Sequence, residues 1–306
     1  MSTAAGGAIV FVHGICSTVE SVFTEMITGL KADPAIKKQW QVIPFNYDWR
    51  QKIADSAAQF RANLVKIVAE QPRVIVIAHS MGGLVARYAL LGASNIPKIE
   101  RLIMLGTPNF GAVTTAQLGI LSQPFVEMSA HVLTGQYLRK PGIADLTRVY
   151  EIFKPFADAD IVTDIEYVTI PGTYFHLYRP IWKKAAGADR RMFKGLNIAT
   201  ELLMALSSMV RVNMDKPHDG IVEERSVRLA PIEPGRWNEK RGSRPKSPTY
   251  LHVIHRVCDN LTHTELCRHP DIIALVRQLV LTPTLAQWQN TLSARDQNKL
   301  TITTVR

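Results

Sequence analysis

Residues 73–92 constrain the fold of this chain more than any other part of the sequence. They begin with four consecutive β-branched apolar residues at 74–77, which are typical of a parallel strand that is covered on both faces. From Gly83 onward, the spacing of apolar residues changes to that of an amphipathic helix. Ser80 lies in the short bend between the two. The pattern therefore predicts a buried strand, a sharp turn that presents a serine, and a helix.

A serine between such a strand and such a helix lies on a strained turn with its hydroxyl exposed. The turn closes when the residues two positions before and after the serine are small, and here these are Ala78 and Gly82. The usual pattern is G-x-S-x-G, so Ala78 is a departure, although alanine is still small. The string A-H-S-M-G-G is also found in bacterial lipases, and here the sequence resembles the α/β-hydrolase lipases and esterases. The alternative is a serine in an ordinary turn.

Two further motifs follow the same order as in that superfamily. Residues 8–12 predict a buried strand, and His13-Gly14 after it is a second signature of these hydrolases. Residues 101–105 predict another buried strand, and the following Gly-Thr-Pro-x-x-Gly recurs in lipases and in the lecithin acyltransferase-like group. The resemblance covers residues 8–281. It implies an α/β-hydrolase fold, with a mostly parallel central sheet, helices on both faces and a helical lid or cap insertion.

We expect residues 1–306 to form one domain, because α/β folds often reach this size as a single unit. Residues 112–164 show no strand pattern and leave the sheet where such enzymes insert a lid. This segment is either a lid that moves or a fixed helical cap. Residues 173–215 form a second insertion before the acid loop, and residues 282–306 form a C-terminal extension. Other expected elements are strands at 42–47, 167–170 and 250–257 and helices at 54–69 and 270–281.

A serine hydroxyl needs a base to take its proton and an acid to orient that base. In this fold the chain order is Ser, then Asp or Glu, then His, which Ser80, Asp219 and His263 satisfy. Among nine histidines, His263 is favoured because it lies in the loop between the last predicted strand and the last helix. His255 is the runner-up, and neither His13 nor His79 is expected to face the hydroxyl.

Asp-Gly also marks plain turns, so the acid is less certain than the serine. D-G-I-V followed by a serine matches the acid loop of bacterial triacylglycerol lipases, which favours Asp219. Its rivals are Asp160, Asp164 and Asp215.

An oxyanion hole requires backbone N–H groups aimed at the developing negative charge. The resemblance assigns these donors to Met81, which follows the serine, and to Ile15, which follows His-Gly. The apolar side chains Leu121, Phe125 and Leu133 of the 112–164 insertion are predicted to bind the acyl chain. Some bacterial lipases hold calcium through a carboxylate at the offset of Glu265, but no other ligands can be placed. We therefore predict no metal and no cofactor.

The net charge is +10, and residues 179–246 carry much of the excess, with 15 Lys and Arg against 8 Asp and Glu. This segment is either a solvated basic surface or a face that makes peripheral contact with anionic lipid. We find no nucleic-acid motif. The longest stretch without charged side chains, residues 102–126, contains Gly, Pro and polar residues and predicts no transmembrane segment.

Three cysteines are too few for a disulfide framework. Cys258 and Cys267 bracket the predicted histidine loop, and a disulfide between them is an alternative to two free thiols. The first residues show no basic region followed by a long apolar core. We therefore expect a cytoplasmic protein, or a secreted one if a signal peptide has been removed.

The predicted function is a serine hydrolase, a lipase or esterase, that cleaves small-molecule or lipid carboxylic esters through an acyl-enzyme. One alternative is a lipid acyltransferase or phospholipase on the same scaffold. The other is a hydrolase-fold binding protein without catalysis.

Overall fold

One parallel sheet forms the centre of the molecule. The computed structural model describes residues 6–15, 17–91, 96, 99–109, 141, 145, 165–172, 219, 222, 224–227, 250–252 and 261–292. Within these residues, the strand order is β2-β1-β3-β4-β5-β6, and every neighbouring pair is parallel. The strands are β1 (Gly7–Val12), β2 (Trp40–Phe45), β3 (Val74–His79), β4 (Ile99–Leu105), β5 (Glu166–Ile170) and β6 (Tyr250–His252).

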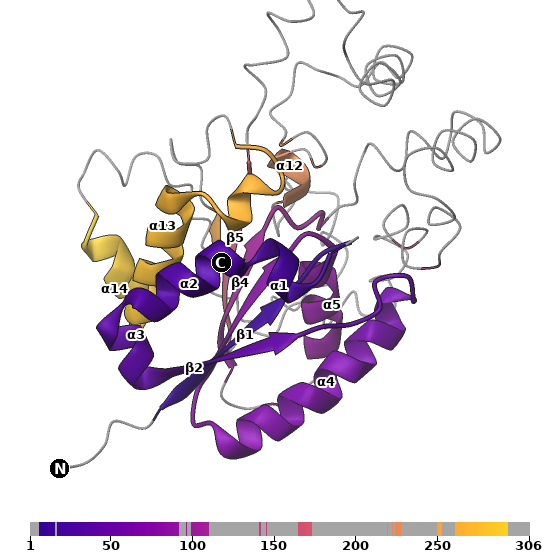
Figure 1. The fold of residues 1–306 in the computed structure, drawn as a ribbon, viewed down its shortest axis with the longest axis horizontal. Helices are drawn as coiled ribbons and strands as arrows, with labels where there is room; N and C mark the ends of the chain where they lie inside the picture. Colours follow the sequence, from indigo (N-terminus) through magenta and orange to yellow (C-terminus); the bar gives the residue numbers. More distant parts are fainter. Residues whose placement is uncertain are drawn as a thin grey trace, which may run out of the picture.

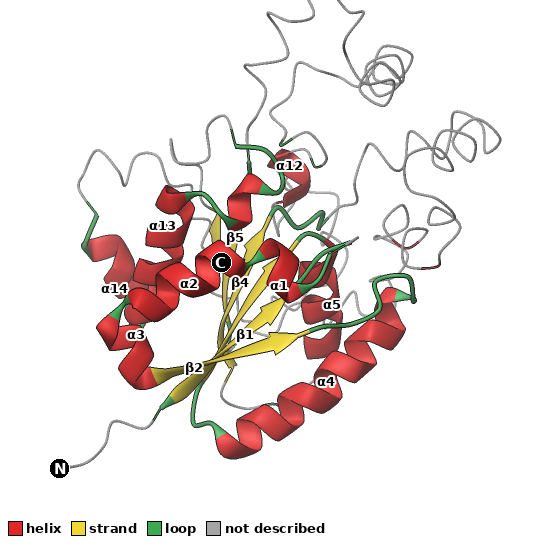
Figure 2. Ribbon diagram, in the orientation of Figure 1, coloured by secondary structure: helices red, strands yellow, loops and turns green. Residues whose placement is uncertain are grey.

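Helices cover both faces of this sheet (Figures 1 and 2). One face is covered by α4 (Ile53–Glu70) and α5 (Met81–Leu90). The other face is covered by α1 (Val19–Val22), α2 (Thr24–Ala32), α3 (Pro34–Gln39), α13 (Pro270–Leu281) and α14 (Leu285–Asn290). Two short elements complete the described part of the chain, α12 (Glu224–Val227) and a 3-10 turn, η5 (Glu265–Cys267).

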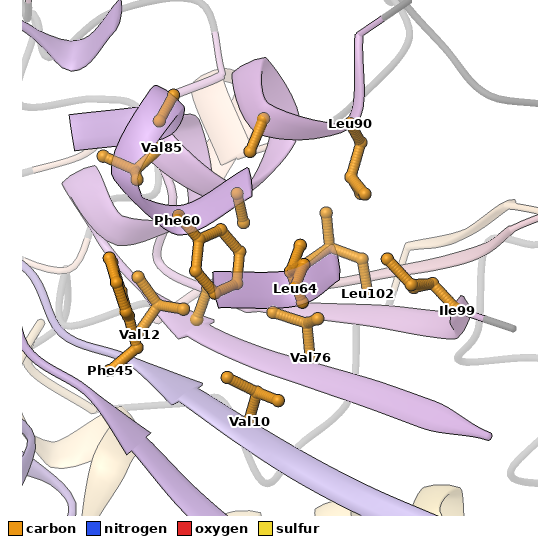
Figure 3. Close-up of a cluster of buried hydrophobic side chains, with 14 of the residues drawn as sticks. Val10, Val12, Phe45, Phe60, Leu64, Val76, Val85, Leu90, Ile99 and Leu102 are labelled. Carbon is orange, nitrogen blue, oxygen red and sulfur yellow. The ribbon is translucent and has the colours of Figure 1, made fainter. Parts of the chain in front are cut away.

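The two cores follow from the alternation of side chains along each strand. In β1 and β3, Val10 and Val76 point toward α4 and α5, where they pack with Phe60 and Leu64 (Figure 3). The intervening residues, such as Phe11 in β1, pack against the helices of the other face. Because both faces of the central strands β1 and β3 are buried, these strands are nearly continuous apolar runs rather than alternating ones.

Two helices on the same face of the sheet, α13 and α1, begin with side-chain caps. The helix expected at 270–281 is α13, which begins after His269; the His269 ring accepts a hydrogen bond from the backbone N–H of Asp271, and Pro270 occupies the first helical position. A capping box begins α1: the Thr18 hydroxyl accepts the backbone N–H of Ser21, and the Ser21 hydroxyl accepts the backbone N–H of Thr18. These caps fix the residues at which the loops before α13 and α1 end and the helices begin.

The C-terminal extension begins as part of the packed fold. Trp288 of α14 is buried, and the backbone N–H of Leu285 donates to a Glu166 carboxylate oxygen over 2.8 Å. Arg101 of β4, itself 1% exposed, forms an ion pair with Glu166 and donates to the carbonyl of Leu279. The residues after α13 are thus fixed to β4 and β5.

Much of the predicted insertions lies outside the described residues. Of residues 112–164, the structure describes Pro141 and Asp145, and all of 173–215 is outside it. The Asp145 carboxylate accepts the backbone N–H of Ile53 over 2.7 Å and so caps the start of α4. Within the described part of the chain, no helix is long and apolar enough to cross a bilayer.

Candidate active site

The candidate site lies at the carboxyl edge of the sheet, where ligands bind in open α/β folds. Because all the strands are parallel, their carboxyl ends share one edge. His13 follows β1, Ser80 follows β3, Gly106 follows β4 and Gly172 comes two residues after β5. Asp219 and His263, 44 residues apart in the chain, meet at the same place.

Ser80 has a strained backbone. Its φ is 53° and its ψ is −128°, and it is the single non-glycine residue with positive φ in the described part of the chain. Such conformations cost on the order of 1–3 kcal/mol and are maintained by the surrounding structure. Here the Ser80 N–H donates to the Leu105 carbonyl over 2.9 Å, and the Ser80 carbonyl accepts the Gly83 N–H over 3.0 Å. Both bonds hold the turn between β3 and α5.

Close packing explains why Gly82 follows the serine turn. A Cβ at this position would lie 2.2 Å from the His13 carbonyl oxygen and 2.6 Å from that of Val12. The first turn of α5 therefore lies directly against the end of β1. This packing brings the serine turn next to the His-Gly turn, since a Cβ at Gly14 would lie 2.8 Å from the Ser80 Cβ.

Asp219 and His263 form a buried pair. The Nδ1 of His263 lies 2.7 Å from Oδ2 of Asp219, and the two side chains are 6% and 0% exposed. Two backbone contacts fix the same pair: the His263 N–H donates to the Asp219 carbonyl over 3.0 Å, and the Val222 N–H donates to Asp219 Oδ1 over 2.7 Å. Within the described residues, the buried Nε2 of His263 has no hydrogen-bond partner, so it is the ring atom left to accept a proton.

Two glycines leave room for this pair. Gly106 has a φ of +57°, and a Cβ there would lie 3.0 Å from His263 Nδ1 and 3.1 Å from Asp219 Oδ2. A Cβ at Gly172 would lie 2.8 Å from the Asp219 Cβ. The turns after β4 and β5 therefore lie against Asp219 and His263 with backbone atoms, without a side chain in between.

His13 holds the turn that carries Ile15. Its Nε2 accepts the backbone N–H of Tyr47 over 3.2 Å, and its Nδ1 donates to the Gly14 carbonyl over 2.8 Å. The Tyr47 hydroxyl donates to the His13 carbonyl over 3.1 Å, and the two rings stack with centroids 4.4 Å apart. Burial lowers the pKa of His13. The neutral ring thus fixes the backbone conformation of the His-Gly turn.

A second buried network, made by Arg87, Asn109 and Val227, ties α5 to the segment after the predicted acid. Arg87 of α5 donates to the Asn109 side-chain oxygen over 3.0 Å, and the Asn109 amide donates to the Val227 carbonyl over 2.7 Å. Asn109 belongs to the Gly-Thr-Pro-x-x-Gly motif. It occupies a variable position of that motif, so the motif does not predict this contact.

Comparison with solved structures finds bacterial lipases and phospholipases of similar fold. Bacillus licheniformis lipase BlEst2 in its mature form superposes with a TM-score of 0.58 at 20% identity, covering 91% of this chain and 93% of that one. Phospholipase PlaB from Legionella pneumophila superposes with a TM-score of 0.57 at 15% identity, covering 96% of this chain and 63% of that one. The chain has the α/β-hydrolase fold.

Sequence comparison gives two further matches. The model of the lecithin:cholesterol acyltransferase family matches residues 13–128. The uncharacterized protein YJR098C of Saccharomyces cerevisiae is 34% identical over 87 residues, which are 28% of this chain and 12% of the yeast protein. The resemblance to α/β-hydrolase lipases and to the lecithin acyltransferase-like group, predicted from the sequence, is confirmed.

The fold brings the predicted Ser80, Asp219 and His263 to one edge of the sheet. Met81 is the first residue of α5, and Ile15 is half-buried in the turn after His13. The other predicted residues lie outside the described part of the chain: the substrate-binding Leu121, Phe125 and Leu133, the rival acids Asp160, Asp164 and Asp215, and His255.

Glu265 and Cys267 have local roles that the sequence did not reveal. The Glu265 carboxylate accepts both the backbone N–H and the hydroxyl of Thr262, over 2.7 and 2.6 Å. These bonds hold the Glu265 carboxylate against the residue that precedes His263. Cys267 is a free, buried thiol, whose pKa is raised by burial, and Cys258 lies outside the described residues.

Proposed function

We propose that this α/β-hydrolase is a serine hydrolase that cleaves carboxylic esters of lipid-like substrates through an acyl-enzyme. Ser80 is the nucleophile, His263 the general base and Asp219 the acid that orients it. The observation that carries the proposal is a buried Asp219–His263 pair at the same edge of the sheet as a serine held at positive φ. The fold and the family match support a lipid-ester hydrolase or acyltransferase in general terms.

In the acylation step, Ser80 Oγ attacks the ester carbonyl carbon while its proton moves to His263 Nε2. Asp219 accepts a hydrogen bond from the Nδ1 of His263, which keeps the proton on that nitrogen and the lone pair on Nε2. The carbonyl π bond opens and its electron pair goes to oxygen. The resulting oxyanion accepts hydrogen bonds from the backbone N–H groups of Ile15 and Met81.

Collapse of this intermediate breaks the bond between the carbonyl carbon and the alcohol oxygen. The His263 imidazolium gives its proton to the departing alcohol, and the acyl group remains on Ser80. Water then attacks the acyl-enzyme, with His263 again taking the proton. The second tetrahedral intermediate collapses by breaking the bond between the acyl carbon and Ser80 Oγ, which takes the proton back from His263 as the carboxylic acid leaves. Asp219 stays ionised throughout and stabilises the imidazolium.

Acyl transfer to an alcohol is the second candidate function. It is favoured by the match of residues 13–128 to the lecithin:cholesterol acyltransferase family model. In this variant an alcohol replaces water as the attacking group, and His263 deprotonates it in the same way. Attack on a phospholipid ester uses the same residues, and the similarity to phospholipase PlaB supports this substrate class.

The 112–164 segment is proposed to form the acyl-binding wall, with Leu121, Phe125 and Leu133 in contact with the chain. The support is topological, because this segment follows β4 directly and β4 pairs with the strand that precedes Ser80. An insertion that leaves from this edge lies over or beside the site. Each buried CH₂ contributes roughly 0.8 kcal/mol, so this wall sets chain-length preference.

The deciding experiment measures turnover of p-nitrophenyl esters from acetate to palmitate, with and without an acceptor alcohol. Hydrolysis predicts carboxylic acid as the product, whereas acyl transfer predicts an acceptor-dependent ester. Ser80→Ala should abolish both turnover and labelling by a fluorophosphonate. Ser56→Ala, at a buried serine of α4, is the matched control and should keep both. A wild-type protein without turnover or labelling would instead favour the binding-protein alternative.

A further inference from the structure

His79, the residue before the predicted nucleophile, contacts the loop that carries the predicted base. Its Nε2 lies 3.0 Å from the main-chain carbonyl oxygen of His263, although the two residues are 184 positions apart. Their rings are tilted at 47° with centroids 4.6 Å apart. The side chain of the last residue of β3 therefore contacts both the main chain and the ring of the predicted base, His263.

The His79 ring is held from two other sides. Phe23, at the end of α1, packs edge-on against it with centroids 6.4 Å apart. At the His-Gly turn, a Cβ on Gly14 would lie 3.1 Å from the His79 Nδ1. His79 thus contacts the base loop and the turn that precedes Ile15, while its own backbone continues into Ser80.

The contact to a carbonyl oxygen determines how His79 is protonated. A carbonyl accepts, so the hydrogen must be on Nε2, and within the described residues Nδ1 has no partner. Burial lowers the pKa of His79 well below its usual value, and the nearby His263 lowers it further. The ring is therefore neutral at neutral pH. It places no second positive charge beside His263 when that base takes a proton.

We propose that His79 is a positioning residue that fixes the orientation of His263 by donating its Nε2–H to the His263 main-chain carbonyl. This inference rests on the proposed function, because it assigns His79 a task only if His263 is the base. Asp219 holds one side of the His263 ring and backbone N–H, and His79 holds the carbonyl. Together these contacts hold the ring and the backbone of His263, whose Nε2 has no hydrogen-bond partner within the described residues.

The test compares two amide variants that differ by one methylene. In His79→Gln, the terminal amide reaches the position of Nε2 and still donates to the carbonyl, whereas in His79→Asn it stops near Nδ1. We expect His79→Gln to keep kcat within about 3-fold of wild type. His79→Asn should lose on the order of 10–100-fold in kcat with KM nearly unchanged, because small displacements of catalytic groups are costly.

Two further measurements separate positioning from stability and from the proposed function. Leu64→Ala, in the core between α4 and the sheet, destabilises the fold without contacting the site and should leave kcat unchanged in the folded protein. The low-field proton signal of the Asp219–His263 hydrogen bond reports the orientation of His263 without any substrate. It should stay sharp in His79→Gln and broaden or shift in His79→Asn.

Wild-type kcat and an unchanged low-field signal in His79→Asn would overturn the proposal. A loss that His79→Gln shares equally would also overturn it, since reach to the carbonyl would then be irrelevant. If wild type turns over no ester, the proposed function fails, and the proton signals of the two variants still decide whether His79 positions His263.

Discussion

Gly106→Ala is a sharp test of the site geometry, because Gly106 has no chemical role of its own. A methyl group at this position would lie 3.0 Å from His263 Nδ1, 3.1 Å from Asp219 Oδ2 and 3.0 Å from Leu266 Cδ1. Ordinary van der Waals contacts lie at 3.4–4 Å. The added methyl group must therefore displace Asp219 and His263 by a few tenths of an ångström, or move the turn after β4.

The size of the effect has two parts. A φ of +57° costs a residue with a Cβ about 1–2 kcal/mol relative to glycine. Overpacking a close-packed site typically costs a further 1–3 kcal/mol, roughly. We therefore expect the free energy of unfolding to fall by about 2–5 kcal/mol. Since a 1 Å misplacement can cost about 10²-fold in rate, a shift of a few tenths should lower kcat on the order of 10-fold.

Urea unfolding and p-nitrophenyl ester turnover, measured on the same preparations, test both parts. Gly29→Ala is the matched control: Gly29 lies inside α2, and a Cβ there would meet the movable Cγ2 of Ile273 at 2.7 Å. Its kcat should equal that of wild type. A Gly106→Ala protein with wild-type kcat would refute the argument, because the Asp219–His263 pair could then not depend on its contact with this turn.

Three other predictions follow from the same geometry. Asp219→Asn should lower kcat by about 10⁴-fold with unchanged circular dichroism, as in a serine protease, and near-normal turnover would transfer the role of the acid. His13 and His79 have lowered pKa values when folded, so the unfolded chain takes up their protons first as pH falls below 6.5. The free energy of unfolding should then decrease by up to about 1.4 kcal/mol per pH unit for each histidine, and His79→Gln should reduce this slope in urea titrations. Glu166→Gln should destabilise the fold by about 3 kcal/mol, because buried Arg101 loses its partner, and leave kcat unchanged; a loss of turnover at full stability would contradict this.

The strands and the serine turn are predictable from sequence because their signals are local. Runs of β-branched residues such as 74–77 are apolar on both faces, and only a covered parallel strand suits them. The serine turn follows from small residues at fixed offsets from Ser80, and the glycine contacts show why Gly82 is required. The helix at 270–281 is predictable to the residue because Pro270 marks its start.

Side-chain contacts between distant segments have no such local signal. His79 and His263 meet only because β3 lies in the middle of the sheet and the loop before α13 crosses its edge, and neither fact appears in the residues around them. The same is true of Tyr47, which follows β2 and contacts His13 after β1 because the two strands pair. The sequence alone could say that neither His13 nor His79 should face the serine hydroxyl, but it could not say what each contacts instead.

The three buried histidines of this edge differ in the partner that fixes each ring. His13 accepts a backbone N–H at Nε2, so its proton is on Nδ1, where it donates to the Gly14 carbonyl. His79 faces a carbonyl with Nε2, so its proton is on Nε2. His263 faces a carboxylate with Nδ1, which leaves an unpartnered Nε2 lone pair within the described site. Burial favours the neutral form of the first two rings, whereas the third is hydrogen-bonded directly to a buried carboxylate. Under the proposed function, a proton that leaves Ser80 therefore has one suitable acceptor among these imidazoles, and the hydrogen-bond partners of each ring determine which one it is.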